Sequence, residues 1–251
     1  MLADTHCHLD FDEFDHDREE LLKQITDNNI QRLINPSISR NNWQNVISLS
    51  KQYPLITAAI GMHPCFINDH NPNDLAELEN QLITENISLL GEIGLDKRVD
   101  KFNEQLFYFA EQLKIAKKLN LPVIIHSVRA HTEIIHQLKL LKFTAGGIIH
   151  AFNGPIDIAE SYLNLGFKLG IGSILTYPKN KLLNIITSLP LSSFVLETDS
   201  PDMPPHHSAK NRNTPLSLIL IYNIVCQNRP ESKLEIENEL WHNSCQFFKF
   251  R

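Results

Sequence analysis

The sequence predicts an α/β protein, a (β/α)8 or TIM barrel, that forms a single domain over residues 1–251. Eight short apolar runs, rich in β-branched residues, alternate with amphipathic segments along most of the chain, which is the pattern of parallel strands covered by helices. The length of 251 residues is typical of one such barrel. No linker, low-complexity tract or internal repeat indicates a second domain.

The strand candidates are the apolar runs, and most of them are apolar on both faces, as buried parallel strands are. They span residues 2–8, 32–36, 55–63, 87–95, 122–126, 147–152, 167–173 and 194–199. Each strand should bring its last residues to the same end of the barrel, where the active site of this fold lies.

The helix candidates lie between these strands. In the longest one, apolar residues recur at spacings of four and three from Phe102 to Ala116 and so form one buried face. The others span residues 17–28, 42–52, 74–85, 130–141, 155–165 and 179–189, and one or two more are expected between 214 and 248. Residues 201–215, rich in Pro, His, Asn and Arg, are expected to form a long loop over the barrel mouth.

The composition favours a soluble enzyme. Apolar residues make up 42% of the chain, and its net charge is −6 with an isoelectric point near 6.0. This charge argues against a surface for tight binding of duplex nucleic acid, but it allows a nucleic-acid substrate held by metal ions and a few local cations. The cysteines show no paired spacing, and no secretory signal or apolar run of ~18 residues is seen. We therefore expect a reduced, cytoplasmic protein that does not bind a membrane.

The N-terminal segment carries the motif from which the functional interpretation starts. His6 and His8 stand two positions apart after an apolar start, so in a strand they project from the same face. Asp4 stands two residues before His6, so in a strand it projects from the same face, one layer deeper in the barrel. From there it could orient the imidazoles. Two imidazoles on one face can bind one divalent cation, but this motif alone is equally compatible with polar residues of the core.

Metal-binding residue types also stand at the ends of four later strand candidates. Glu92 closes the apolar run 87–90, and three further apolar stems end in His126, His150 and Asp199. One such residue would be interpreted as a polar group satisfied at a strand end. Because five strand ends carry them, we predict a metal centre at the barrel mouth, with two adjacent divalent cations and one bridging carboxylate. The predicted ligands are His6, His8, Glu92, His126, His150 and Asp199.

These residues belong to six motifs that follow one another along nearly the whole chain. They are Asp4-Thr-His-Cys-His-Leu-Asp10, Gly61-Met-His-Pro64, Gly91-Glu-Ile-Gly-Leu-Asp96, His126-Ser127, His150-Ala-Phe-Asn-Gly154 and Glu197-Thr-Asp-Ser-Pro201. In this order they resemble the TatD family of metal-dependent hydrolases, and the last, extended to Pro204, is most similar to its YjjV branch. The resemblance implies a TIM barrel, divalent metals, the same six ligands and hydrolysis of phosphodiesters, typically of DNA.

The sequence departs from the family pattern beside its fifth strand. Family members commonly follow the His-Ser pair with Arg, whereas here Val128 takes that place and Arg129 comes one position later. A phosphate contact would therefore be displaced to Arg129 or lost. The Arg212-Asn-Thr-Pro215 segment matches the Arg-Asn-x-Pro motif of the family, so Arg212 is expected to retain a role in substrate binding.

Two further residues have a functional interpretation and an alternative. Glu197 shares the parity of Asp199 and lies one layer deeper, so we expect it to orient a ligand histidine, with a catalytic acid as the alternative. His63 follows a strand at the barrel mouth, where it could hydrogen-bond a substrate phosphate, act as an acid or pack within its loop. Besides Glu92, Asp199 is the only carboxylate expected at the mouth, so it is the predicted proton acceptor.

The leading hypothesis is a hydrolase of phosphodiester bonds in DNA ends or short nucleic acids, with a water activated by two divalent metals. Four imidazoles favour Zn, Mn or Ni over Mg, although the family is often described as magnesium-dependent. The second hypothesis is an amidohydrolase-type enzyme that cleaves a lactone, an amide or an aminoacyl ester. Many such barrels bridge their metals with a modified lysine where this chain has Glu92, which favours the first hypothesis. A binding protein that has lost its metals is disfavoured by the complete ligand set, and no obligate protein partner is inferred.

Overall fold

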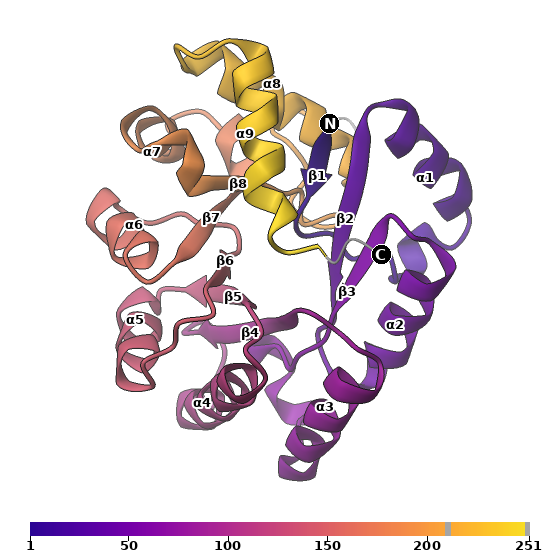
Figure 1. Cartoon of the computed structure of the whole chain (residues 1–251), viewed down its shortest axis with the longest axis vertical. Helices are drawn as coiled ribbons and strands as arrows, with labels where there is room; N and C mark the ends of the chain where they lie inside the picture. Colours follow the sequence, from indigo (N-terminus) through magenta and orange to yellow (C-terminus); the bar gives the residue numbers. More distant parts are fainter. Residues whose placement is uncertain (209–211, 249–251) are drawn as a thin grey trace.

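The computed structural model describes residues 1–208 and 212–248 of the chain. Within this part, eight strands alternate with eight helices, and a ninth helix follows (Figure 1). The strands are β1 (Leu2–Asp4), β2 (Ile30–Pro36), β3 (Ile56–Ala59), β4 (Leu90–Asp96), β5 (Val123–Val128), β6 (Gly147–Ile149), β7 (Phe167–Ile171) and β8 (Phe194–Leu196). The helices are α1 (Arg18–Asp27), α2 (Trp43–Gln52), α3 (Pro72–Thr84), α4 (Phe102–Leu119), α5 (His131–Leu140), α6 (Ile156–Leu163), α7 (Leu182–Ser188), α8 (Leu218–Asn228) and α9 (Lys233–Cys245).

The strands form a closed parallel barrel. Strands β1 to β3 and β4 to β8 pair in chain order, and all of these pairs are parallel. The two sheets join where the Gly91 amide donates to the Ile60 carbonyl over 3.0 Å. They join again at the ends of the chain, where the Thr5 amide donates to the Leu196 carbonyl over 2.9 Å. The predicted TIM barrel, with residues 2–8 beside residues 194–199, is therefore confirmed.

The barrel interior and its outer layer are packed separately. One residue from nearly every strand region fills the interior, where it meets the aromatic rings that follow α9. This inner cluster contains Ala3, Ile34, Ala59, Leu89, Ile124, Ile148, Val195, Phe247 and Phe248. Helices α1 to α7 surround the strands, and α9 runs past β1 and β8 (Figure 1). Because the C-terminal aromatic rings pack into the interior, the functional groups are left to the opposite end of the barrel.

Several strands are shorter than their apolar runs suggested. Strand β1 ends at Asp4 and β8 at Leu196, so His6, His8 and Asp199 lie in the segments just beyond the strands. The physical reason is the Asp4 carboxylate, which accepts hydrogen bonds from backbone amides that a regular ladder would have paired.

The expected loop over the mouth has no regular structure where it is described, in residues 201–208 and 212–214, while residues 209–211 lie outside the described part. The C-terminal region forms two helices, as the sequence allowed. No helix among residues 1–208 and 212–248 has the length and apolar character needed to cross a bilayer.

Candidate metal centre

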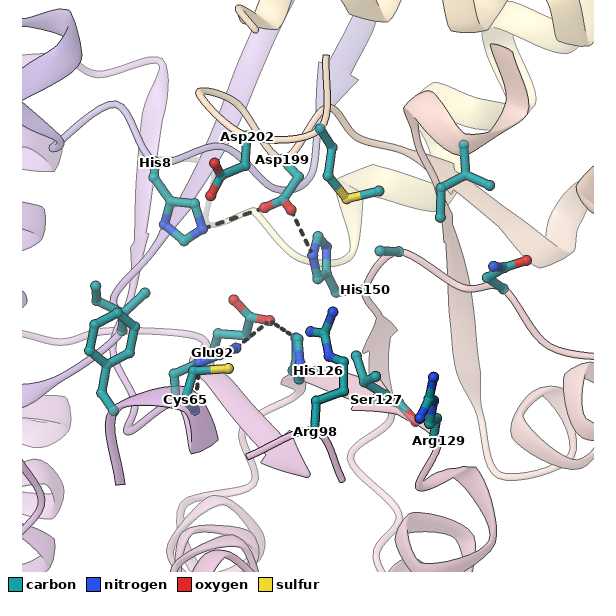
Figure 2. Close-up of a pocket in the computed structure, with 18 of the residues that line it drawn as sticks. His8, Cys65, Glu92, Arg98, His126, Ser127, Arg129, His150, Asp199 and Asp202 are labelled. Atoms are coloured by element: carbon teal, nitrogen blue, oxygen red, sulfur yellow. Dashed lines mark hydrogen bonds and ion pairs between the residues drawn. The ribbon is translucent and has the colours of Figure 1, made fainter. Parts of the chain in front are cut away.

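The predicted ligands from both ends of the chain converge on one point. The Nε2 atoms of His6 and His8 lie 3.2 Å apart, and Glu92 Oε2 lies 3.1 Å from His6 Nε2. Asp199 Oδ1 lies 3.6 Å from each of these two nitrogen atoms. Four ligand groups therefore face one another, from the segments just after β1 and β8 and from within β4; Figure 2 shows His8, Glu92 and Asp199 of this set.

The same two carboxylates also face the other predicted ligands. Glu92 Oε1 lies 3.1 Å from His126 Nδ1, and Asp199 Oδ2 lies 3.5 Å from His150 Nε2. The rings of His6 and His150 stack with their centroids 3.6 Å apart, so the two groups of ligands are adjacent. Glu92 thus directs one oxygen toward His6 and the other toward His126. Asp199 directs one oxygen toward His6 and His8 and the other toward His150, so each carboxylate could bridge two cations.

These separations fit a divalent cation. Ligand atoms that lie about 2.0–2.2 Å from a tetrahedral ion stand about 3.3–3.6 Å from one another. The nitrogen and oxygen atoms around His6 Nε2 lie 3.1–3.6 Å away from it. The Nε2 atoms of His6 and His8 face each other at 3.2 Å inside a buried site, where a shared cation would satisfy both lone pairs.

The charges of the cluster suit a cation as well. Burial raises the pKa of Glu92, but the nearby His63, His6 and His150 outweigh this effect and hold that pKa well below its usual range. Burial also opposes ionisation of Asp199, yet contact with His150 keeps the pKa of this carboxyl low. Burial and the neighbouring His150 lower the pKa of His6. At His8, His126 and His150 burial is outweighed by the nearby carboxylates, which raise the pKa of these imidazoles. A cation that binds among the ionised carboxylates would therefore replace protons on these rings.

Glu197 lies beneath His150, which is the position predicted for it. Its Oε1 atom is 3.0 Å from His150 Nδ1, although the two are not aligned for a hydrogen bond, and it accepts from the Ala151 amide at 2.6 Å. The Glu197 side chain fits there because residue 170 is glycine. A Cβ atom on Gly170 would lie 2.1 Å from Glu197 Oε2, so any other residue would displace the carboxylate.

Asp4 has a different role from the one predicted. Its hydrogen bonds go to the backbone amides of His6 and Thr198, at 3.1 and 3.0 Å, and to the Thr198 hydroxyl at 2.6 Å. It therefore holds the backbone of the two metal-binding segments together instead of orienting an imidazole. The side chain is fully buried, and burial raises the pKa of Asp4 to about 8.

The second glycine of the Gly91–Asp96 motif places Glu92 beside His126. Gly94 pairs with His126 in the ladder between β4 and β5. Its φ of 151° and the 2.0 Å that would separate an added Cβ from the His126 carbonyl both exclude a side chain. The close approach of the two strands brings Glu92 Oε1 within 3.1 Å of His126 Nδ1.

His63 belongs to the cluster and not only to its loop. Its Nδ1 accepts from the Cys65 amide at 3.2 Å, which leaves Nε2 to carry the proton toward Glu92 Oε1, 3.4 Å away. The ring lies 4.3 Å from that of His126 by centroids, and burial lowers the pKa of His63 to about 4. A neutral imidazole with one N–H directed at the ligand group could also donate to a substrate oxygen.

The arginines predicted to contact substrate are placed differently from each other. Val128 and Arg129 line the cavity above the cluster, whose volume is about 810 Å³. Arg212 does not line it. Its guanidinium donates to Asp17 and to the Glu13 carbonyl and lies over the ring of Phe14. The expectation that Arg212 contacts substrate is therefore not supported by its position, because the loop turns the side chain toward the start of α1.

Three polar residues at the mouth were missed or set aside by the sequence interpretation. Asp96 Oδ2 lies 3.0 Å from His126 Nε2. Its position at the end of the apolar strand β4 is the signal that could have identified it. His131 begins α5 and carries no strand-end signal, yet it lines the cavity and its Nδ1 lies 2.8 Å from the Ser127 hydroxyl. Asp202 also lines the cavity, so Asp199 and Glu92 are not the only carboxylates there.

Comparison with known proteins assigns the chain to a family. A family model described as TatD related DNase matches residues 3–249. The metal-dependent hydrolase YjjV of Escherichia coli K12 is 36% identical over 98% of this chain and 96% of its own length. A metal-dependent hydrolase of Haemophilus influenzae is 33% identical over 98% of each chain. The crystal structure of the TatD homologue YjjV from Escherichia coli superposes with a TM-score of 0.95 at 35% identity, covering 100% of this chain and 98% of that one. The protein is therefore a member of the TatD family of metal-dependent hydrolases.

Proposed function

We propose that the protein is a nuclease of the TatD type, which hydrolyses phosphodiester bonds in DNA ends or short nucleic acids with two divalent cations. The observation that carries this proposal is the pair of carboxylates, Glu92 and Asp199, each with one oxygen toward each of two groups of histidines. Two adjacent cations can stabilise both the entering and the leaving oxygen of a phosphoryl transfer.

One cation would be held by His6 and His8, and the other by His126 and His150, with Glu92 and Asp199 shared between the two. Nitrogen-rich coordination favours Zn, Mn or Ni, and Mg remains a candidate because carboxylate oxygens complete both groups. When bound, the cations lower the pKa of water and offset the negative charge of a phosphate.

The residues of the chain supply the proton transfers and the substrate contacts. Asp199 is 18% exposed at its side chain, more than the other ligands at its end of the cluster, and its low pKa keeps it ionised, the form in which a carboxylate can accept a proton from the attacking water. The Nε2–H of His63 is available to a phosphate oxygen beside Glu92. Arg129 lines the cavity and adds a cationic contact for the substrate backbone.

The decisive experiment strips the protein of metal and assays labelled DNA, RNA and aminoacyl substrates with Zn, Mn, Ni or Mg added back. We expect hydrolysis of DNA that depends on the added ion and is absent in the metal-free protein. Cleavage of an aminoacyl ester or a lactone, with DNA left intact, would instead establish the amidohydrolase-type alternative.

A further inference from the structure

Arg98 is a cavity residue to which the proposed chemistry assigns no task. Its Nε and Nη2 atoms donate to the two oxygens of Asp96, at 3.0 and 2.6 Å. An arginine has five N–H donors in one plane, so this contact fixes the orientation of the guanidinium while it uses only part of it. Among the described residues, the Nη1 group has no hydrogen-bond partner. A fixed guanidinium with unused donors in a cavity is suited to an oxyanion.

In the described part of the chain, Arg98 is linked to the proposed metal ligands only through Asp96. Asp96 lies between it and His126, and the Asp96 carboxylate meets the Nε2 atom of that imidazole. The Nδ1 atom of the same ring faces Glu92 and the metal site. An anion bound to the Nη1 group of Arg98 would therefore be held by a residue outside the proposed ligand set.

Arg129 lies on the same side of the cavity, in the segment after the neighbouring strand β5. Its backbone has a φ of 55°, and no ion pair is formed by its side chain with any residue in 1–208 or 212–248. Arg98 is partly neutralised by Asp96, so Arg129 supplies the net positive charge of this wall. Figure 2 shows both arginines on the side of His126 and Ser127.

The opposite wall of the cavity is acidic. Asp199 and Asp202 come from the segment after β8 and lie on the side of His8 (Figure 2). Because the proposed cations offset the charge of Asp199, Asp202 is the acidic residue left on the β8 side, and a flanking phosphate is favoured toward the loops after β4 and β5. The cavity of about 810 Å³ is of the size that encloses a ligand larger than a single phosphate group.

We propose that Arg98 and Arg129 form a subsite for a second phosphate, next to the one that is cleaved. The substrate class is accordingly an oligonucleotide with a flanking phosphate, and not a diester with a single phosphate. This inference rests on the proposed nuclease function. It adds that the chain beyond the scissile bond leaves the metal centre over the β4 and β5 loops.

The test compares three metal-dependent hydrolysis rates that differ only in the flanking phosphate. The substrates are the dinucleotides d(TpT), d(pTpT) and d(TpTp), which place a second phosphate on neither side, the 5′ side or the 3′ side. We expect the wild type to cleave one of the two phosphorylated dinucleotides with a kcat/KM about tenfold or more above that of d(TpT), the scale of one charge-assisted hydrogen bond. The preferred end identifies the direction in which the strand leaves.

The measured quantity is the kcat/KM for the preferred phosphorylated dinucleotide divided by the kcat/KM for d(TpT). Arg98→Gln and Arg129→Gln should each reduce this ratio toward one. In Arg98→Gln, Asp96 loses its guanidinium partner, and this could lower the hydrolysis of all three dinucleotides. Such a general loss cancels in the ratio. Arg40→Gln is the matched control, because Arg40 is also paired with a carboxylate but lies on the surface beside Glu77. The salt dependence supplies a second measurement. For a longer single-stranded DNA, the slope of log kcat/KM against log salt should become shallower by about 0.7 in Arg129→Gln, the contribution of one phosphate contact in a single strand.

A wild type that cleaves all three dinucleotides equally would overturn the proposal, and so would a preference that survives both substitutions. Neither result would contradict the nuclease function, because both are measured on a protein that hydrolyses d(TpT). If none of the dinucleotides and no longer DNA is cleaved with any metal, the nuclease function itself fails and the subsite falls with it.

Discussion

Replacing Asp4 by asparagine tests whether the contact that closes the barrel depends on a protonated carboxyl group. Burial raises the pKa of Asp4 from 3.8 to about 8. In the protonated form Oδ2 can donate to Thr198 Oγ1 over 2.6 Å, while Oδ1 accepts from the amides of His6 and Thr198. An asparagine side chain has nearly the same shape and can donate and accept in the same places, so Asp4→Asn should fold.

The direction of the pH effect follows from the two pKa values. Because the folded state binds this proton more tightly than the unfolded state, the stability that Asp4 contributes is fully present below pH 3.8 and is lost as the pH rises to about 8. Within that window, each pH unit removes about 1.4 kcal/mol from the free energy of unfolding of the wild type. Asparagine does not titrate, so the variant lacks this loss.

Urea unfolding of both proteins in metal-free form, between about pH 5 and pH 7.5, measures the effect. The free energy of unfolding of Asp4→Asn minus that of the wild type should rise by about 1.4 kcal/mol per pH unit. The exposed Asp157→Asn serves as the control, for which we expect a constant difference. A constant difference for Asp4→Asn would mean that Asp4 is ionised in the folded protein, and the reasoning from burial would be refuted.

Four other substitutions test the metal centre. Glu92→Gln should lower metal content and turnover together while the protein stays folded, because both carboxylate oxygens face histidines; unchanged metal in elemental analysis would exclude Glu92 as a ligand. Asp199→Asn should lose at least ~100-fold in kcat, with a much smaller change in substrate affinity, and turnover near the wild-type level with metal retained would remove it from the mechanism. Asp96→Ala should weaken metal binding by about 10–100-fold through the His126 ring that it contacts, which a metal titration measures. Gly94→Ala should lower the urea midpoint markedly, since its Cβ would lie 2.0 Å from a carbonyl oxygen; an unchanged midpoint would contradict the close approach of β4 and β5.

The sequence was most informative where an apolar strand ends in a polar residue. His126 and His150 follow apolar stems whose direction the barrel determines, so their common location could be predicted before any contact was known. The family resemblance and this strand-end pattern agreed on the same six residues, and the structure brings all six together. Their role as metal ligands remains a prediction until metal binding is measured.

Contacts that depend on the path of a loop could not be predicted in the same way. Arg212 belongs to a segment that matches the family's Arg-Asn-x-Pro motif. This segment nevertheless turns toward α1 and pairs the guanidinium with Asp17. His131 carries no strand-end signal because it belongs to a helix, but the first turn of a helix that follows a barrel strand also faces the mouth. Asp4 projects from the same strand face as His6, which is why the sequence suggested a contact with the imidazoles. Its carboxyl group binds backbone amides instead, and the alternation of strand residues does not predict that choice.

Closure of the barrel through its first and last strands has a consequence for biosynthesis. His6 and His8 leave the ribosome long before Asp199, which emerges only after seven strands have been made. The aromatic rings of Phe247 and Phe248, which fill the interior, come later still. A nascent chain therefore offers only a partial set of ligands to a cation until β8 and Asp199 have been made. Metal loading in the cell should follow synthesis of Asp199, and a product truncated before this residue should not compete for the ion with full affinity.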